Sequence, residues 1–292
     1  MAKVLAVGIA TLDIINEVDG YPREDTEVRA LAQHIRRGGN ATNTLVVLAQ
    51  LGHACAWAGT LADDAQARII RDELAHYHID MTACQEIAGG TTPTSYVTLN
   101  RHNGSRTIVH YRDLPEYPFE RFRQIPQADF QWLHLEGRNL EESEKILRYV
   151  ASSRIKIAIS LEIEKPRPAI ERLFPLSPLL LISRHYAQAR GYADARETLQ
   201  QLRQLAPQAD LLCTWGEQGA WLAPASGGLL HRPAETAEKA VDTLGAGDTF
   251  NAGIIHARSQ GLDWSASLDF ASRLAAYKCG RYGFAGLEAC RI

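Results

Sequence analysis

The sequence predicts an α/β protein in which a mostly parallel sheet is covered by helices on both faces and carries a small β-sheet lid. Short apolar runs alternate with stretches of helical periodicity along most of the chain, as in strand–helix units with buried parallel strands. Two extended segments, at about 14–37 and 91–112, interrupt this alternation. The 292 residues contain no evident linker or internal repeat, and a chain of this length can bury one large core. We therefore expect a single domain, 1–292, with the lid formed by these two excursions.

In the first third of the chain, the elements are predicted from apolar spacing and from glycine and proline punctuation. The expected strands or extended pieces are Val4–Gly8, Ile14–Val18, Val28–Ile35 and Cys55–Gly59. The expected helices are Asn40–Leu51, which stops at Gly52, and Ala65–Tyr77.

A hairpin is expected next, because two Thr/Val/Tyr-rich runs, Thr92–Leu99 and Thr107–Tyr111, flank a turn at Asn103-Gly104. Strand–helix alternation then resumes. The expected strands are Trp132–Leu135, Ile155–Leu161, Leu179–Ile182 and Leu211–Thr214. The expected helices are Glu141–Ser152, Ala193–Leu205, Ala246–Gln260 and Trp264–Lys278.

Composition excludes several classes of protein. A net charge of −3 and a pI near 6.4 give no basic excess for nucleic acid or an anionic membrane. The five cysteines are odd in number and form no CxxC pair, so we expect free thiols in a reducing cytoplasm rather than disulfides or a zinc site. No apolar run reaches the roughly 18 residues of a membrane span.

The segment Asp242–Phe250, with the sequence DTLGAGDTF, carries the chemistry. Two glycines and an alanine open a long helix, whose first amides and positive dipole end attract anions. Asp248 would lie beside a bound phosphoryl group and could take a proton from an attacking hydroxyl. The alternative is that Gly245 and Gly247 only make a turn and that Asp248 only caps the helix.

The nine-residue string resembles the C-terminal signature of the ribokinase/PfkB family of sugar and nucleoside kinases. Arg37–Asn43, RGGNATN, resembles the N-terminal signature of that family. Further segments resemble the ketohexokinase branch: Tyr21–Asp25, Leu135–Asn139, Glu162–Arg167 and Lys278–Gly280. The resemblance covers nearly the whole chain and implies a ribokinase-like three-layer α/β/α sandwich with a β-lid.

The resemblance also implies an activity, in which the γ-phosphoryl group of ATP passes to a hydroxymethyl group with Mg²⁺ on the phosphates. It makes Asp248 the catalytic base and gives the anion hole to the amides of Gly245, Ala246 and Gly247. The implied product is fructose 1-phosphate, made from fructose. The alternatives are another sugar or nucleoside as substrate (ribose, 2-keto-3-deoxygluconate or adenosine), or a sugar sensor without turnover.

Sugar hydroxyls need side chains that donate and accept hydrogen bonds, which suits Asp and Asn. The resemblance implies a substrate-binding set of Asp13, Asp25, Gly39, Asn40, Asn43, Glu136 and Lys165. Helix capping is the alternative for the two asparagines, and an ion pair with Glu164 or Glu162 is the alternative for the lysine. A homodimer joined through the lids is also implied, in which Asp25 reaches the sugar site of the partner.

For the nucleotide, the resemblance implies Gly216, Glu217, Gln218 and Gly219, after a strand end, and Arg106, after the lid turn. The alternative for Arg106 is a solvated loop charge. Asp242 matches a region where many family members hold a monovalent cation such as K⁺. The Asn-x-x-Glu motif that orients Mg²⁺ in many members is replaced here by Ser183-Arg184-His185-Tyr186.

The remaining polar and aromatic groups have simpler expected roles. We expect Trp57, Trp132 and Trp215 to be core residues and the ten histidines to be structural or solvated. The pair Arg36-Arg37 is expected to be surface charge.

Overall fold

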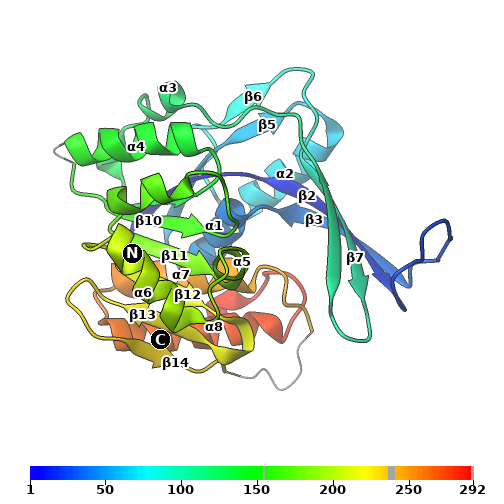
Figure 1. The fold of residues 1–292 in the computed structure, drawn as a ribbon. Helices are drawn as coiled ribbons and strands as arrows, with labels where there is room; N and C mark the ends of the chain where they lie inside the picture. Colours follow the sequence, from blue (N-terminus) through cyan, green and yellow to red (C-terminus); the bar gives the residue numbers. More distant parts are fainter. Residues whose placement is uncertain (154, 236–240, 291–292) are drawn as a thin grey trace.

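The computed structural model describes residues 1–153, 155–235 and 241–290. Its main sheet has the strand order β14-β13-β12-β11-β10-β9-β1-β4 (Figure 1). These strands are β1 (Lys3–Val7), β4 (Ala54–Ala58), β9 (Trp132–Glu136), β10 (Ala158–Ile163), β11 (Leu179–Ser183), β12 (Asp210–Thr214), β13 (Ala220–Ala223) and β14 (Leu230–Arg232). All pair in parallel except β13 and β14, which are antiparallel. The predicted mostly parallel α/β fold is confirmed.

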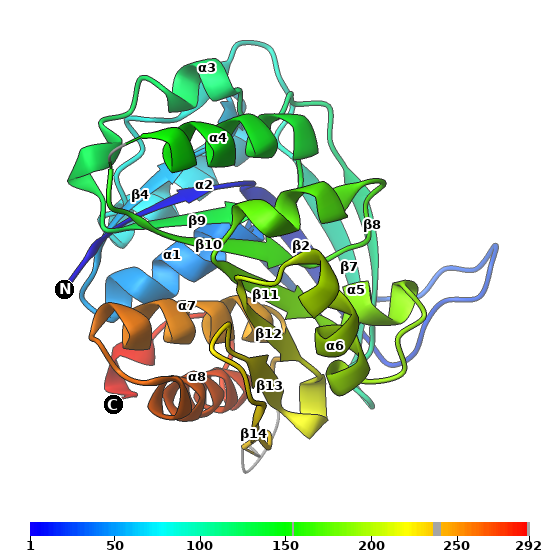
Figure 2. The same ribbon diagram turned by 60° about the vertical axis from the view of Figure 1, so that its left-hand side comes forward.

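Helices cover both faces of the main sheet (Figure 2). One face packs against α1 (Asn40–Gln50), α2 (Ala65–His76), α7 (Ala246–Ser259) and α8 (Trp264–Cys279). The other packs against α4 (Leu140–Ser152), α5 (Arg184–Ala189) and α6 (Ala195–Leu205). Successive strand residues alternate between the two cores, as Val4 and Leu5 do, because strand side chains point to opposite faces in turn. Among the described residues, no helix is long and apolar enough to cross a membrane.

The two excursions pair with each other in a separate sheet with the order β3-β2-β7-β8. Its strands are β2 (Thr11–Val18), β3 (Ala32–Gly38), β7 (Thr94–Asn100) and β8 (Arg106–Tyr111). Only β2 and β7 run parallel to each other. This sheet, which we call the lid, extends to one side of the body, and the loop between β2 and β3 projects away from it (Figure 1).

The sequence missed the short elements and misplaced two strands. The strand expected at Val28–Ile35 begins four residues later, and the one expected at Ile155–Leu161 is observed at Ala158–Ile163. The missed elements are β5 (Thr60–Ala62), β6 (Gln85–Ile87), α3 (Phe119–Phe122), α5, β13 and β14. Such short elements show no clear hydrophobic periodicity in the sequence. Their positions are set by contacts with the rest of the folded chain. The three tryptophans expected in the core are buried.

A buried histidine pair joins α7 to the start of β4. Nε2 of His53 lies 2.8 Å from Nδ1 of His256, and Nδ1 of His53 accepts a hydrogen bond from the backbone N–H of Ala2. His53 therefore carries its proton on Nε2 and donates it to His256. Burial lowers the pKa of both rings, that of His256 to about 4.

We expect the substitution His256→Gln to destabilise the protein less at pH 4 than at pH 7. The fold favours neutral His256, so its stabilisation is complete above the ordinary pKa of 6.5 and is lost as the pH falls toward about 4. This difference in pKa corresponds to about 3 kcal/mol of unfolding free energy. Urea unfolding of both proteins at both pH values measures it, with the exposed His76→Gln as control. An equal effect of His256→Gln at the two pH values would contradict the assignment.

Candidate active site

The carboxyl ends of the parallel strands and the lid enclose a cavity of about 450 Å³. Open α/β sheets bind ligands at this edge. The lid contributes Asp13, Ser95, Arg106, Ile108 and His110. The body contributes the start of α1 (Gly39, Asn40 and Asn43), the end of β10, the end of β11 and the start of α7. The cavity therefore collects most of the predicted site residues.

The start of α7 forms the floor of this cavity. Gly245 has a φ of +77°, and a Cβ there would lie 2.3 Å from a ring carbon of Phe284, so the position requires glycine. A Cβ on Gly247 would meet no atom within 4 Å. The first amides of a helix have no intrahelical acceptor. This turn can therefore hold an anion such as a phosphoryl group.

Asp248, in the first turn of α7, is buried and held by α1. Its Oδ2 accepts a hydrogen bond of 2.6 Å from Nδ2 of Asn43, and its backbone oxygen accepts one from the hydroxyl of Thr44. Burial, with the nearby Glu162 carboxyl, raises the pKa of Asp248 well above its ordinary value. A carboxylate with a raised pKa beside an anion site is suited to take a proton from a hydroxyl.

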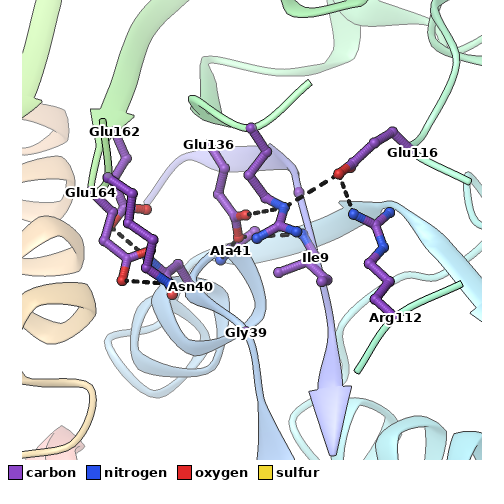
Figure 3. Close-up of polar contacts among 12 residues, drawn as sticks. Ile9, Gly39, Asn40, Ala41, Arg112, Glu116, Glu136, Glu162 and Glu164 are labelled. Carbon is purple, nitrogen blue, oxygen red and sulfur yellow. Dashed lines mark hydrogen bonds and ion pairs between the residues drawn. The ribbon is translucent and has the colours of Figure 1, made fainter. Parts of the chain in front are cut away.

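Glu162, at the end of β10, is a site residue that the sequence analysis did not single out. Its Oε1 accepts a hydrogen bond of 3.0 Å from Nδ2 of Asn40 (Figure 3). Burial and the charge of Glu164 raise its pKa to about 8. The segment Glu162–Arg167 carried part of the family resemblance, but only Lys165 was selected from it.

Glu136 lies outside the main cavity, and its carboxyl points toward Ala41 at the start of α1 (Figure 3). Its Oε1 accepts hydrogen bonds from the backbone N–H groups of Ala41, at 2.5 Å, and Ile9, at 3.3 Å. The N-cap residue of α1, Gly39, offers no side chain, so this carboxyl supplies the missing acceptor. Glu136 therefore supports the turn that presents Asn40.

One row of the lid sheet faces the cavity with three polar side chains. Asp13, Ser95 and His110 are neighbours across β2, β7 and β8. Oγ of Ser95 lies 3.2 Å from Nδ1 of His110, and the hydroxyl of Thr11 donates to Asp13. Burial, with the charges of Arg138 and Lys165, lowers the pKa of His110. Ser95 and His110 were missed, because strand register decides which residues share a row.

At the other end of the cavity, the predicted nucleotide loop is only partly in place. Gly216 lines the cavity, where the Arg184 guanidinium packs against it. Glu217 and Gln218 are exposed and do not line the cavity. Gly219 is buried with a φ of +94°, and a Cβ there would meet the backbone oxygen of Arg232 at 2.0 Å, so it serves the β12–β13 turn. The sequence analysis assigned no individual site role to the neighbouring lining residues Ser183, Arg184, His185, Thr214, Thr243 and Leu244.

Arg106 and Lys165 both line the cavity. Nη1 of Arg106 lies 3.5 Å from Oγ1 of Thr243, so this lid residue reaches the loop before α7. Nζ of Lys165 lies 3.4 Å from a carboxylate oxygen of Glu164, a pairing that the sequence analysis left open. Asp25 lies in the exposed β2–β3 loop with a φ of +58° and does not line the cavity.

Asp242 does not fit a K⁺ site, because its carboxylate is already paired. Oδ1 accepts from the backbone N–H of Leu244, and Oδ2 accepts from Gly283 and pairs with Arg36 and Lys278, each at 3.1 Å. Nζ of Lys278, fully buried, also donates to the backbone oxygen of Asp242 at 2.8 Å. Burial opposes ionisation of Asp242, but the two cations hold its pKa below the ordinary value.

Among the described residues, no cluster of side chains is arranged to bind Mg²⁺. Within residues 1–153, 155–235 and 241–290, no three His, Cys, Asp or Glu side chains are placed to hold a metal ion. The end of β11 presents Ser183, Arg184 and His185 to the cavity, without a carboxylate. The described residues therefore do not fit a Mg²⁺ ion held by protein ligands alone.

The expectation of surface charge is wrong for Arg37, and Arg36 is half-buried in an ion pair. Arg37 is 1% exposed and pairs with Glu73 of α2 at 3.0 Å. Arg36 pairs with Asp242. Neither pairing could be predicted from the sequence, because the acceptors lie far along the chain.

Comparison with known families supports the resemblance found in the sequence. Residues 1–289 match the pfkB family of carbohydrate kinases. The chain is 39% identical to a ketohexokinase of Mus musculus over 293 residues, which is 98% of each protein. It is 26% identical to a ribokinase of Bacillus subtilis (strain 168), covering 98% of this chain and 96% of the other.

Solved structures give the same fold at low identity. A ribokinase from Giardia lamblia superposes with a TM-score of 0.83 at 14% identity, covering 98% of this chain and 96% of that one. A ribokinase of Arabidopsis thaliana, complexed with ribose and ATP, superposes with a TM-score of 0.78 at 19% identity over 97% and 94%. The ribokinase-like fold is therefore confirmed.

Proposed function

Because the chain belongs to the pfkB family of carbohydrate kinases, ATP-dependent phosphotransferases with an alcohol as acceptor, we propose that it phosphorylates a ketohexose. The acceptor is O1 of fructose, and the products are fructose 1-phosphate and ADP. The observation that carries this proposal is the buried carboxyl of Asp248, which lies beside the open glycine turn of α7 in the cavity under the lid. The 39% identity to a ketohexokinase supports fructose as the substrate.

In the proposed reaction, the O1 hydroxyl attacks the γ-phosphorus of ATP while the bond from that phosphorus to the β–γ bridging oxygen breaks. Asp248 takes the hydroxyl proton, and ADP leaves with the bridging oxygen. The amides of Gly245, Ala246 and Gly247 stabilise the charge that develops on the transferred group. Asn43 holds the carboxylate by its hydrogen bond.

We assign the two ends of the cavity to the two substrates. The sugar lies against the start of α1 and the lid row of Asp13, Ser95 and His110, which offer donors and acceptors for hydroxyls. ATP lies along Gly216 and the end of β11, with Arg106 reaching its phosphates from the lid. Mg²⁺ enters bound to the phosphates of ATP. This fits the coordination chemistry of Mg²⁺, which usually keeps several water ligands and takes phosphate oxygens as others.

The experiment that tests this function measures ADP release with a panel of ketoses, aldoses and nucleosides, followed by NMR of the product to locate the phosphate. We expect the highest kcat/KM with fructose and a phosphate on O1. Activity confined to ribose or adenosine would refute the ketohexose assignment. Absence of ADP with every acceptor would refute the kinase and favour a sugar sensor.

We further propose a homodimer joined through the lids. Residues 21–31 are all exposed, and their loop projects from the body in both ribbon views (Figures 1 and 2). Ile35, Tyr96 and Val109, on one row of the lid, are each at least half exposed. An apolar row of this kind is typical of an interaction surface. In the dimer, Asp25 reaches the sugar site of the partner.

Sedimentation equilibrium is expected to give twice the chain mass of 32.3 kDa. Val109→Asp, at a side chain that is 67% exposed, is expected to give monomers that remain folded. Asp25→Ala is expected to raise the KM for the sugar without changing the mass. A monomer with full activity at low concentration would contradict both assignments.

A further inference from the structure

Arg37 combines complete burial with side-chain hydrogen bonds to two helices, α1 and α2. It is the next-to-last residue of the lid strand β3 and is 1% exposed. Its Nε and Nη2 donate to Oε1 of Glu73, on α2, at 3.1 and 3.0 Å. Its Nη1 donates to Oγ1 of Thr42 at 2.9 Å and to Oδ1 of Asn43 at 2.7 Å. Arg37 does not line the cavity, so any contact between it and the reacting groups must pass through a neighbour.

That neighbour is Asn43. The oxygen of its side-chain amide contacts Arg37, and the nitrogen contacts Asp248. A guanidinium only donates hydrogen bonds, so the oxygen of Asn43 must face Arg37. The nitrogen of the same amide then faces Asp248, at 2.6 Å from Oδ2. If the amide rotated by half a turn, its oxygen would meet the carboxylate and its N–H₂ group would meet the guanidinium. Both contacts would then be repulsive.

We propose that Arg37 is a positioning residue for phosphoryl transfer, which fixes the amide of Asn43 so that this amide holds Asp248 toward the acceptor hydroxyl. Glu73 anchors the guanidinium through Nε and Nη2, which leaves Nη1 for Asn43. The inference rests on the proposed function, because it takes Asp248 as the base.

A purely structural role makes a different prediction. Arg37 joins β3, α1 and α2, so its loss is expected to reduce stability in either case. The charge of Arg37 also lowers the pKa of Asp248 directly, so Arg37→Met raises this pKa in either case. Arg37→Lys keeps the charge, and in this variant the pKa of Asp248 rises only if Arg37 holds the amide of Asn43. The hydrogen bond from Asn43 favours the ionised form of Asp248, so an amide free to rotate would raise the pKa of this carboxyl.

The test compares Arg37→Met, which keeps an apolar stem, with Arg37→Lys, which keeps the charge but loses the planar fork. Arg203→Met is the matched control, because Arg203, near the end of α6, also donates several hydrogen bonds to backbone oxygens and does not line the cavity. For each variant we would measure kcat, the two KM values and the melting temperature. A ¹³C NMR titration of the Asp248 carboxyl, assigned with Asp248→Asn, measures its pKa.

We expect Arg37→Met to lower kcat at least about tenfold, because displacement of a reacting group by about 1 Å can cost about 10²-fold. The KM for ATP should stay within about twofold of wild type, since ATP is bound by other residues, and the pKa of Asp248 should rise. Arg37→Lys should recover part of kcat while its Asp248 pKa remains raised, and Arg203→Met should change neither quantity.

A kcat of Arg37→Met equal to that of Arg203→Met, with an active wild type, would overturn the positioning role. An unchanged pKa of Asp248 in Arg37→Lys would overturn it as well. If wild type shows no turnover with any acceptor, the proposed function fails and the pKa measurement alone decides the role of Arg37. If Arg37→Met does not fold, Arg37→Lys supplies the same measurements.

Discussion

Asp248→Asn is expected to lower kcat by about 10²–10⁴-fold, the usual loss when a general base is removed. Asparagine matches aspartate in shape, and its amide oxygen can still accept the hydrogen bond that Asn43 donates to Oδ2. The substitution removes a buried carboxyl next to Glu162, so the melting temperature should not fall. The amides at the start of α7 are unchanged, so ATP should bind with nearly wild-type affinity.

Measurements of ADP release over time give kcat, and calorimetric titration with ATP gives the affinity for ATP. Asp263→Asn is the matched control, because Asp263 caps the next helix, α8, through a single backbone N–H and lies outside the cavity. Near-normal turnover in Asp248→Asn would remove Asp248 from the role of base. Loss of ATP binding together with turnover would instead indicate a disrupted anion site.

Gly39→Ala is expected to reduce both stability and sugar binding. Gly39 has a φ of +102°, and a Cβ would lie 2.3 Å from the backbone oxygen of Ile9 and 2.9 Å from Cα of Ala10. A backbone with this φ and a ψ of +130° is disfavoured for a non-glycine residue by about 1–3 kcal/mol, and the overlap with backbone adds about 1–3 kcal/mol. Gly39 precedes Asn40 in the cavity wall, so the KM for the sugar should rise at least about tenfold.

Gly52→Ala separates backbone strain from steric overlap. Gly52 has a φ of +86°, but a Cβ there would meet only the sulfur of Met1, at 4.0 Å. Its unfolding free energy should fall by about 1–2 kcal/mol, with no change in KM. Urea unfolding and sugar-dependent kinetics measure both variants. Equal losses in the two would show that the close approach of Gly39 to Ile9 does not matter.

The sequence predicted the fold class and the long elements from features that are local. Apolar spacing placed α1, α2, α7 and α8 to within a few residues. The start of α7 was predicted because glycines, a helix start and an aspartate within nine residues are sufficient to suggest an anion site with a base. Asp13, Asn40 and Asn43 were expected from the family resemblance, and the structure brings them to the same cavity.

Residues whose role depends on distant partners were missed or misjudged. Arg37 was expected at the surface, yet it is buried against Glu73, 36 positions along the chain. Glu162 acquires its raised pKa from burial at the end of β10. Ser95 and His110 enter the site only because β2, β7 and β8 pair in one register. Asp242, expected at a cation site, is neutralised by Arg36 and Lys278.

The sequence by itself therefore determined the family, the α/β architecture and the anion-binding turn with its aspartate, because each follows from patterns along the chain that do not depend on which distant residues meet. The tertiary structure alone decided how the base is held. Asn43 and Asp248 are 205 positions apart and meet only when α1 packs beside α7. Burial and hydrogen-bond geometry depend on the packing of the whole chain, so they cannot be predicted from a local sequence pattern.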